Sequence, residues 1–155
     1  MQQHRLWTNM VALIGTALLL SAWGGRPVFA QAKPVVVVHL THYTDDLHAA
    51  SMALKLANAM QQKGAQVTLM LDMEGVRLVS THQPQDLRWG TSDAIAGYYD
   101  AFVKGGGQVV VCPHCAKAAG LDDKSLRTGA KIVTEEALAN ALLRNWYEIT
   151  STTEE

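Results

Sequence analysis

The stretch "VVVVHLTHYTDDLHAASMALKLANAM", from Val35 to Met60, contains the alternation that decides the fold. It opens with a run of apolar residues without polar alternation, which is typical of a strand covered on both faces. Thr44, Asp45 and Asp46 then supply a cap and first-turn acids for a helix with one apolar face, and Gly64 ends that helix. The stretch therefore predicts one strand followed by one helix.

The same alternation continues along the chain. Further strands are predicted at residues 65–72, 108–112 and 130–134, with a candidate last strand at 145–150, and further helices from residue 92, from residue 113 and over 135–144. This spacing is typical of a parallel sheet with helices on both faces. Residues 73–90 are polar and too long for an ordinary turn, so we expect a loop that covers a site, in which Gly75 serves a turn.

Residues 1–30 have the order of a secretory signal peptide, with a charged start, a short apolar core and small residues around Ala30. We expect cleavage before Gln31 or after Ala32, and export to the periplasm or another compartment outside the cytoplasm. Residues 31–155 then form a single domain with its own core. The alternative reading is an uncleaved membrane anchor.

Cleavage also changes the charge of the protein. It removes Arg5 and Arg26 from the 13 basic residues and none of the 14 acidic residues, so the mature chain has a net charge of about −3. No basic stripe remains. We therefore expect no nucleic acid as a partner and no membrane binding after signal cleavage.

The sequence Cys112-Pro113-His114-Cys115 contains the only two cysteines. Pro113 suits the first turn of a helix, which puts Cys112 at the helix cap, where free amides favour the thiolate. A protonated His114 would act in the same direction. Cys115, one turn further along, is placed to resolve a mixed disulfide or persulfide on Cys112. The pattern therefore predicts a catalytic site for sulfur transfer or thiol–disulfide exchange, made of Cys112, Cys115 and His114.

Three other interpretations of this segment stay open. Cys112 and Cys115 could bind copper(I) or zinc together with His114, His42 or His39, since soft thiolates and imidazoles suit these metals. No other cofactor is expected. A plain disulfide between the two cysteines would stabilise the fold by only about 2 kcal/mol, because it closes a very short loop. A non-catalytic oligomeric protein would tolerate the loss of both cysteines.

The sequence contains more large aromatic side chains than one small core needs, and such residues are favoured at interfaces. Those considered for packing or for contacts between subunits are Trp89, Tyr98, Tyr99, Phe102 and Trp146. They favour a homo-oligomer.

Two resemblances add to these inferences. Cys-Pro-His-Cys is also the active-site sequence of exported thiol oxidants of the DsbA type, but there the pair follows an early strand, whereas here most of the mature chain precedes it. Over nearly the whole mature chain, the opening stretch, "GAQVTLMLDMEGVRL", "VVVCPHCAKAAGL" and "LRTGAKIV" resemble the DsrE/DsrF-like family of small sulfur-relay proteins.

The second resemblance implies a three-layer α/β/α domain with a largely parallel five-stranded sheet, usually in a homo-oligomer. It also implies that a cysteine after a central strand accepts sulfur as a persulfide. By position this is Cys112 or Cys115, and we favour Cys112 because it ends the strand. The partners would be a sulfur donor or acceptor protein, or a small sulfur compound.

Overall fold

The computed structural model describes residues 32–151, with side chains up to residue 143. The predicted signal peptide and its cleavage site before Gln31 lie outside the described residues. Within the described residues, the chain from Lys33 onwards forms one compact unit. Within residues 32–151, no helix combines the length and the apolar character needed to cross a membrane.

Among the described residues, four parallel strands form the sheet, and they lie side by side in the order in which they occur in the sequence. The strands are β1 (Val35–Leu40), β2 (Gln66–Leu71), β3 (Gln108–Val111) and β4 (Ala130–Ile132). The helices are α2 (Leu47–Gln62), the 3₁₀ helix η2 (Met73–Val79), α3 (Ile95–Lys104), α4 (Pro113–Ala118) and α5 (Glu135–Ser151).

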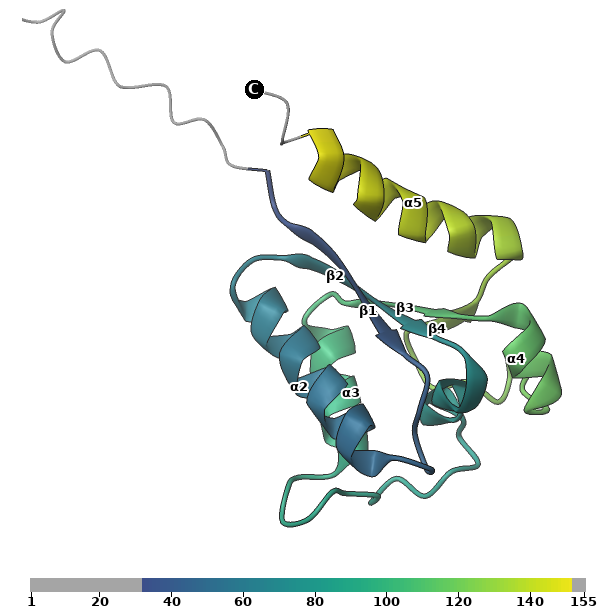
Figure 1. Cartoon of the computed structure of the whole chain (residues 1–155). Coiled ribbons are helices and arrows are strands. Elements are labelled where there is room, and N and C mark those ends of the chain that lie inside the picture. Colours follow the sequence, from purple (N-terminus) through teal and green to yellow (C-terminus); the bar gives the residue numbers. More distant parts are fainter. Residues whose placement is uncertain (1–31, 152–155) are drawn as a thin grey trace, which may run out of the picture. The chain divides into compact units, whose positions relative to one another are not determined.

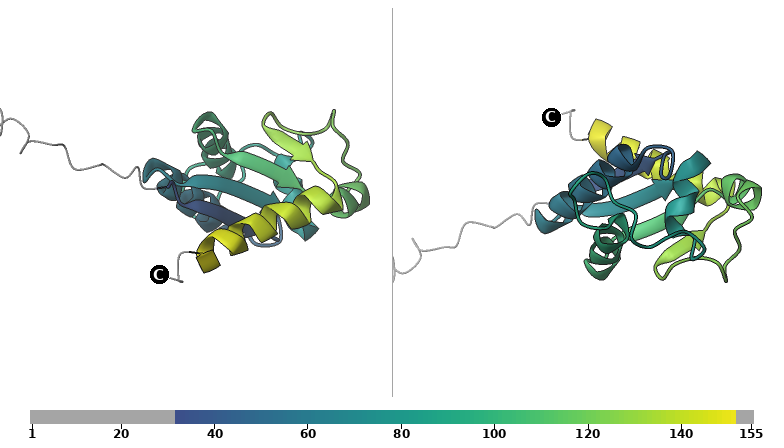
Figure 2. Two further views of the ribbon diagram at one scale, coloured as in Figure 1. Left: turned by 90° about the horizontal axis from the view of Figure 1, so that it is seen from above. Right: turned by 90° about the horizontal axis from the view of Figure 1, so that it is seen from below.

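Helices cover both faces of the sheet, so the predicted three-layer α/β/α architecture is confirmed. Helices α2 and α3 pack on one face and α5 crosses the other (Figure 1). Figure 2 shows the same arrangement from above and from below, with α4 and η2 at the end of the sheet where the strands finish. This end is the one at which open parallel sheets bind ligands.

The prediction of a fifth strand at residues 145–150 is wrong within the described chain, because α5 continues through these residues to Ser151. The physical reason is visible in the sequence. Glu135 and Glu136 provide first-turn acids, and neither glycine nor proline interrupts residues 135–151, so nothing ends the helix early.

The core lies between the sheet and the layer of α2 and α3. Leu54, Tyr99 and Phe102 are fully buried there against Leu69 and Val111. Residues 35–38 of β1 are only half-buried, because β1 is an edge strand. The prediction that this strand is covered on both faces therefore holds only in part.

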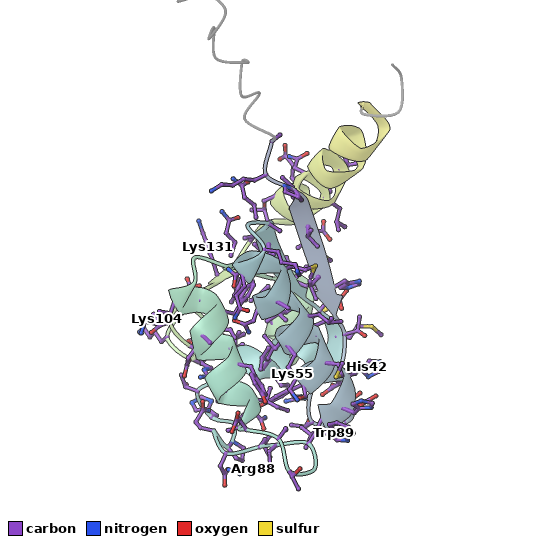
Figure 3. All side chains as sticks on the ribbon, turned by 90° about the vertical axis from the view of Figure 1, so that its left-hand side faces the viewer. His42, Lys55, Arg88, Trp89, Lys104 and Lys131 are labelled. Atoms are coloured by element: carbon purple, nitrogen blue, oxygen red, sulfur yellow. The ribbon has the colours of Figure 1, made fainter. Side chains whose placement is uncertain are left out.

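The aromatic residues have different roles. Tyr99 and Phe102 belong to the core, and the hydroxyl of Tyr99 donates to the Thr128 carbonyl oxygen at 2.9 Å. Burial raises the pKa of Tyr99 to about 12. Trp89 is 44% exposed and stacks on His48, with ring centroids 3.9 Å apart, so the loop that contains it contacts the start of α2 (Figure 3). The side chain of Trp146 lies outside the described residues.

The long segment after β2 is more ordered than a loop. Its first seven residues form η2, whose Val76, Leu78 and Val79 are buried in the core. Only the remainder, up to the start of α3, is a loop, and α3 begins at Ile95 rather than at residue 92. The segment was predicted as a polar loop, but Val76, Leu78 and Val79 form an apolar face that packs η2 against the core.

Candidate functional site

The site starts at the carboxyl edge of the sheet. The last paired residues of the first three strands, Leu40, Leu71 and Val111, align across the sheet. The next residue of two strands extends the ladder: the Asp72 amide donates to the Leu40 carbonyl at 3.3 Å, and the Cys112 amide donates to the Leu71 carbonyl at 2.9 Å. Asp72 and Cys112 are therefore held at the ends of adjacent strands.

The two predicted cysteines come together at this edge. Cys112 is the N-cap residue of α4, Pro113 occupies the first position of the helix, and Cys115 lies one turn further along. Both cysteines are free thiols and half-buried, and their side chains are hydrogen-bonded to each other. The predicted geometry of a helix start directly after the strand is thus present.

Met73 contributes an unusual backbone conformation beside the pair. Its φ angle is +45°, and it is the only non-glycine residue of the described chain with a positive φ. The Met73 amide donates a hydrogen bond to the Cys115 sulfur. A left-handed conformation costs an ordinary residue about 1–3 kcal/mol and tends to occur at functional sites. Here it accompanies an amide that is aimed at a thiol.

The surroundings of Cys115 raise its pKa, which makes it a poor nucleophile at neutral pH. Burial is the main cause of a raised Cys115 pKa, and the hydrogen bond that the Cys115 thiol donates to Cys112 and the charge of Asp72 act in the same direction. The Met73 amide opposes them, because it stabilises the thiolate. At neutral pH Cys115 is therefore held as a thiol.

Asp72 connects this pair with β1. Its Oδ2 lies 2.8 Å from Nε2 of His39, whereas its Oδ1 is buried and has no hydrogen-bond partner among the described residues. The position of His39 within an apolar strand predicts a hydrogen-bonded core residue. It is hydrogen-bonded, but its side chain is 47% exposed, because β1 lies at the edge of the sheet.

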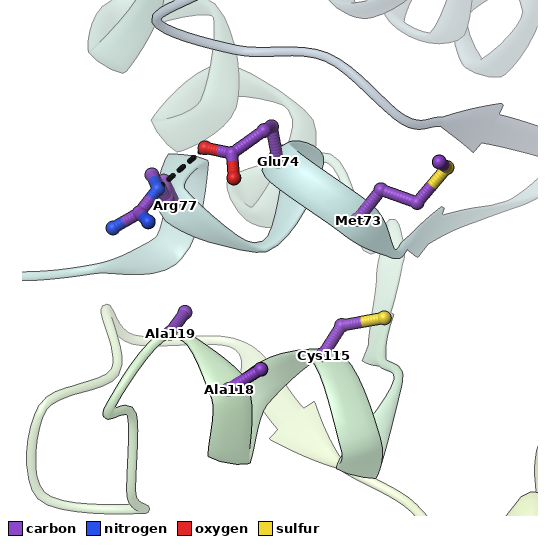
Figure 4. Close-up of a pocket in the computed structure, with 6 residues that line it drawn as sticks. All are labelled: Met73, Glu74, Arg77, Cys115, Ala118 and Ala119. Carbon is purple, nitrogen blue, oxygen red and sulfur yellow. Dashed lines mark hydrogen bonds and ion pairs between the residues drawn. The ribbon is translucent and has the colours of Figure 1, made fainter.

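A small pocket opens between η2 and α4. Its volume is about 180 Å³, and it is lined by Met73, Glu74, Arg77, Cys115, Ala118 and Ala119 (Figure 4). Arg77 Nε and Glu74 Oε2 form an ion pair at 2.6 Å along one side. The pocket therefore places one of the two thiols next to a pair of opposite charges.

Residues 35–150 match the model of the DsrE/DsrF-like family. The chain belongs to this family. The crystal structure of the ychN protein from E. coli has the same fold, with a TM-score of 0.58 and 22% identity, over 72% of this chain and 92% of that one. MTH1491 from Methanobacterium thermoautotrophicum, a protein of unknown function, gives a TM-score of 0.51 and 15% identity, over 74% and 92%. At these identities the likeness concerns the fold alone. No curated protein matches the chain.

The histidines predicted for the site of this DsrE/DsrF-like protein have carboxylate partners. His114 Nε2 lies 2.5 Å from Oε1 of Glu135, and both side chains are well exposed. His42 Nδ1 lies 2.6 Å from Oδ2 of Asp45, and this hydrogen bond raises the His42 pKa. These contacts join α4 to the start of α5 and β1 to the start of α2.

The described part of this DsrE/DsrF-like chain contains no preformed metal-binding site. No three His, Cys, Asp or Glu side chains of residues 32–143 are grouped so that they could hold a metal ion. The set of Cys112, Cys115, His114 and His42 is therefore not assembled as it stands. Copper or zinc binding stays a prediction.

Sequence reasoning missed the residues that η2 contributes. Met73, Glu74 and Arg77 lie in a segment that was predicted as a covering loop, and Asp72 directly precedes that segment. A signal was present, because they follow a strand whose carboxyl end meets the same edge as Cys112. Gly75 was a second signal: its amide donates to the Thr41 carbonyl, and a Cβ there would lie 2.1 Å from the Leu40 carbonyl oxygen. Close approach, not a turn, is what requires this glycine.

Proposed function

We propose that this DsrE/DsrF-like protein is exported and carries sulfur on Cys112, as a persulfide or through a mixed disulfide, with Cys115 as the resolving thiol. The observation that supports this most is the contact between the two thiols at the end of β3, together with the raised pKa of Cys115. Only a thiolate attacks sulfur, and Cys115 is held protonated. Cys112 is therefore the first nucleophile, and Cys115 reacts afterwards as the resolving thiol.

The transfer needs no external oxidant or reductant. The Cys112 thiolate attacks the outer sulfur of a donor persulfide, R–S–SH. The S–S bond of the donor breaks, R–S⁻ leaves, and Cys112 becomes Cys112–S–SH. An acceptor thiolate then attacks the same outer sulfur, and Cys112 leaves again as a thiolate. The sulfur atom keeps its oxidation state throughout.

Cys115 provides a second outcome. Its thiolate attacks the inner sulfur of Cys112–S–SH, so that HS⁻ leaves and the Cys112–Cys115 disulfide forms. In this step the transferred sulfur is reduced and the two cysteines are oxidised. The Met73 amide, which already donates to the Cys115 sulfur, would stabilise the Cys115 thiolate that must form before the attack.

Intact-mass measurement of the reduced mature protein after exposure to inorganic polysulfide tests this function. We expect the mass of added sulfur on the wild-type protein and its loss after treatment with a reductant. Cys112→Ser should gain no sulfur. Cys115→Ser should gain sulfur and keep it longer, because the resolving thiol is absent.

Two results would contradict the proposal. A wild-type protein that stays at its unmodified mass would favour the non-catalytic interpretation. Sulfur added equally to Cys112→Ser would show that Cys112 is not the acceptor. A protein purified with bound copper or zinc, which is lost in both cysteine variants, would instead support the metal alternative.

A further inference from the structure

The pocket between η2 and α4 has a thiol and a pair of opposite charges along its walls. Figure 4 shows the sulfur-bearing side chains of Met73 and Cys115 directed toward one end, with Arg77 and Glu74 further along η2. Cys112 is not among the lining residues. A molecule in the pocket therefore meets the sulfur pair on the side of Cys115.

The charged pair is suited to a zwitterion. It uses one N–H of the Arg77 guanidinium and one oxygen of Glu74, and the two side chains are 36% and 49% exposed. Within the described residues, the terminal amino groups of Arg77 and the second oxygen of Glu74 have no other partner. A simple anion such as thiosulfate would be attracted by Arg77 and repelled by Glu74. A molecule with adjacent carboxylate and ammonium groups is attracted by both.

The size of the pocket limits the ligand further. Its volume of about 180 Å³ corresponds to about six water molecules, at roughly 30 Å³ each. Ala118 and Ala119 form one wall with the smallest side chains that a helix readily accepts. A single amino acid of the size of cysteine fits this volume, whereas a tripeptide thiol would extend out of the pocket into solvent.

We propose that the pocket binds a small α-amino-acid thiol of the size of cysteine, with its carboxylate at Arg77, its ammonium at Glu74 and its sulfur toward Cys115. The inference rests on the proposed function, because the Cys112–Cys115 disulfide must form before the bound thiol has a reaction partner. The pocket is then the place where the oxidised pair is reduced.

The chemistry proceeds in two exchanges. The bound thiolate, R–S⁻, attacks the sulfur of Cys115, the Cys112–Cys115 bond breaks, and Cys112 leaves as a thiolate. The mixed disulfide Cys115–S–S–R remains. A second R–S⁻ attacks the sulfur of R, which releases the Cys115 thiolate and R–S–S–R. The protein gains two electrons, and two amino-acid thiols become one disulfide.

The test uses the full mature chain, oxidised to the Cys112–Cys115 disulfide, and four thiols. L-cysteine carries both charged groups, cysteamine lacks the carboxylate, 3-mercaptopropionate lacks the ammonium group, and glutathione exceeds the pocket. Each rate of reduction is divided by the rate of the same thiol with hydroxyethyl disulfide, which removes intrinsic reactivity. We expect the rate to saturate with L-cysteine and, below saturation, to exceed that of each other thiol about tenfold.

Two variants separate the charges. Arg77→Gln should lower the rate about tenfold with L-cysteine and 3-mercaptopropionate, and should not lower it with cysteamine. Glu74→Gln should lower the rate with L-cysteine and cysteamine, and should not lower it with 3-mercaptopropionate. Arg88→Gln and Glu136→Gln remove the same charges outside the pocket and should leave all four rates unchanged. Ala118→Leu, on the exposed side of α4, should fill the pocket and slow L-cysteine, cysteamine and 3-mercaptopropionate, but not glutathione.

Rates that follow intrinsic reactivity, without saturation and without an effect of Arg77→Gln, Glu74→Gln or Ala118→Leu, would overturn the inference. Sulfur loading from polysulfide is measured on the same proteins and does not need the pocket. Loading without thiol selectivity therefore overturns the pocket ligand alone. Thiol selectivity without loading supports the pocket ligand and contradicts the persulfide carrier.

Discussion

At the scale of single residues, the environment of the two cysteines is unequal. Burial, the hydrogen bond from Cys115 to Cys112 and the charge of Asp72 raise the Cys115 pKa, and the Met73 amide offsets only part of this. The sequence predicted an unequal pair from the helix start at Pro113. It could not predict Asp72 or the Met73 amide, because these reach Cys115 only once β2 and β3 are paired.

Alkylation of the reduced wild-type protein should follow this inequality. At pH 6 we expect Cys112 to be labelled faster than Cys115. The rate at Cys115 should continue to rise above pH 9, because its pKa is raised above the ordinary value of 9.0 and the thiolate fraction still increases there. Peptide mass mapping after short exposure to iodoacetamide measures both rates. Faster labelling of Cys115 at pH 6 would indicate that Cys115 is the acceptor of sulfur and Cys112 the resolving thiol.

The left-handed backbone of Met73 gives a second prediction at this scale. Met73→Gly keeps the conformation without the steric cost, whereas Met73→Ala keeps the cost and loses only the exposed side chain. The free energy of unfolding of Met73→Gly should therefore exceed that of Met73→Ala by about 1 kcal/mol. Urea unfolding of both variants measures the difference. Equal stabilities would mean that residue 73 relaxes out of this conformation.

At the scale of elements, the alternation of strands and helices was predictable because its signals are local. The apolar run of β1, the caps around α2 and the glycines after α3 all act within a few residues. The structure of η2 was not predictable in this way. Its buried face consists of Val76, Leu78 and Val79, and that face becomes apparent only when the sheet edge is there to cover it.

Gly75 determines how closely η2 approaches β1. Gly75→Ala would place a Cβ 2.1 Å from the Leu40 carbonyl oxygen, so η2 must move away and carry the Met73 amide with it. We expect a loss of about 1–3 kcal/mol in the free energy of unfolding and faster alkylation of Cys115. Gly97→Ala is the matched control, since nothing lies within 4 Å of its Cβ.

Gly97 lies inside α3, where alanine is the better helix former. Gly97→Ala should therefore be neutral or stabilising by up to about 1 kcal/mol. If the close approach to Leu40 is what requires Gly75, thermal unfolding should show a loss of stability for Gly75→Ala and no loss for Gly97→Ala. A loss of stability of the same size in both variants would refute this explanation.

At the scale of the whole molecule, the first expectation is export. We expect the mature protein to begin at Gln31 or directly after Ala32, because the small residues there follow a short apolar core. N-terminal sequencing of the protein recovered from fractionated cells measures this. Recovery from the cytoplasm with Met1 intact would contradict export.

The second expectation at this scale is self-association. Met52 and Leu56 on α2 are exposed, as is Trp89, which stacks on the same helix. We expect a homo-oligomer by light scattering at micromolar concentration, since such side chains are favoured at interfaces. Leu56→Glu should shift the population toward the monomer, with Lys104→Glu as an exposed control. A wild-type monomer would contradict the expectation.

The order of the strands also has a consequence for how the chain folds. Every strand of the described sheet pairs only with its neighbours in the sequence, from β1 to β4. A chain that emerges N-terminus first can therefore add one strand at a time to an edge that already exists, with short loop closures at each step. Cys112 follows the third strand, so its thiol appears after β1 and β2 can pair. Cys112 and Cys115 therefore emerge when part of the sheet can already have formed. This shortens the time during which the two thiols are exposed on an unfolded chain.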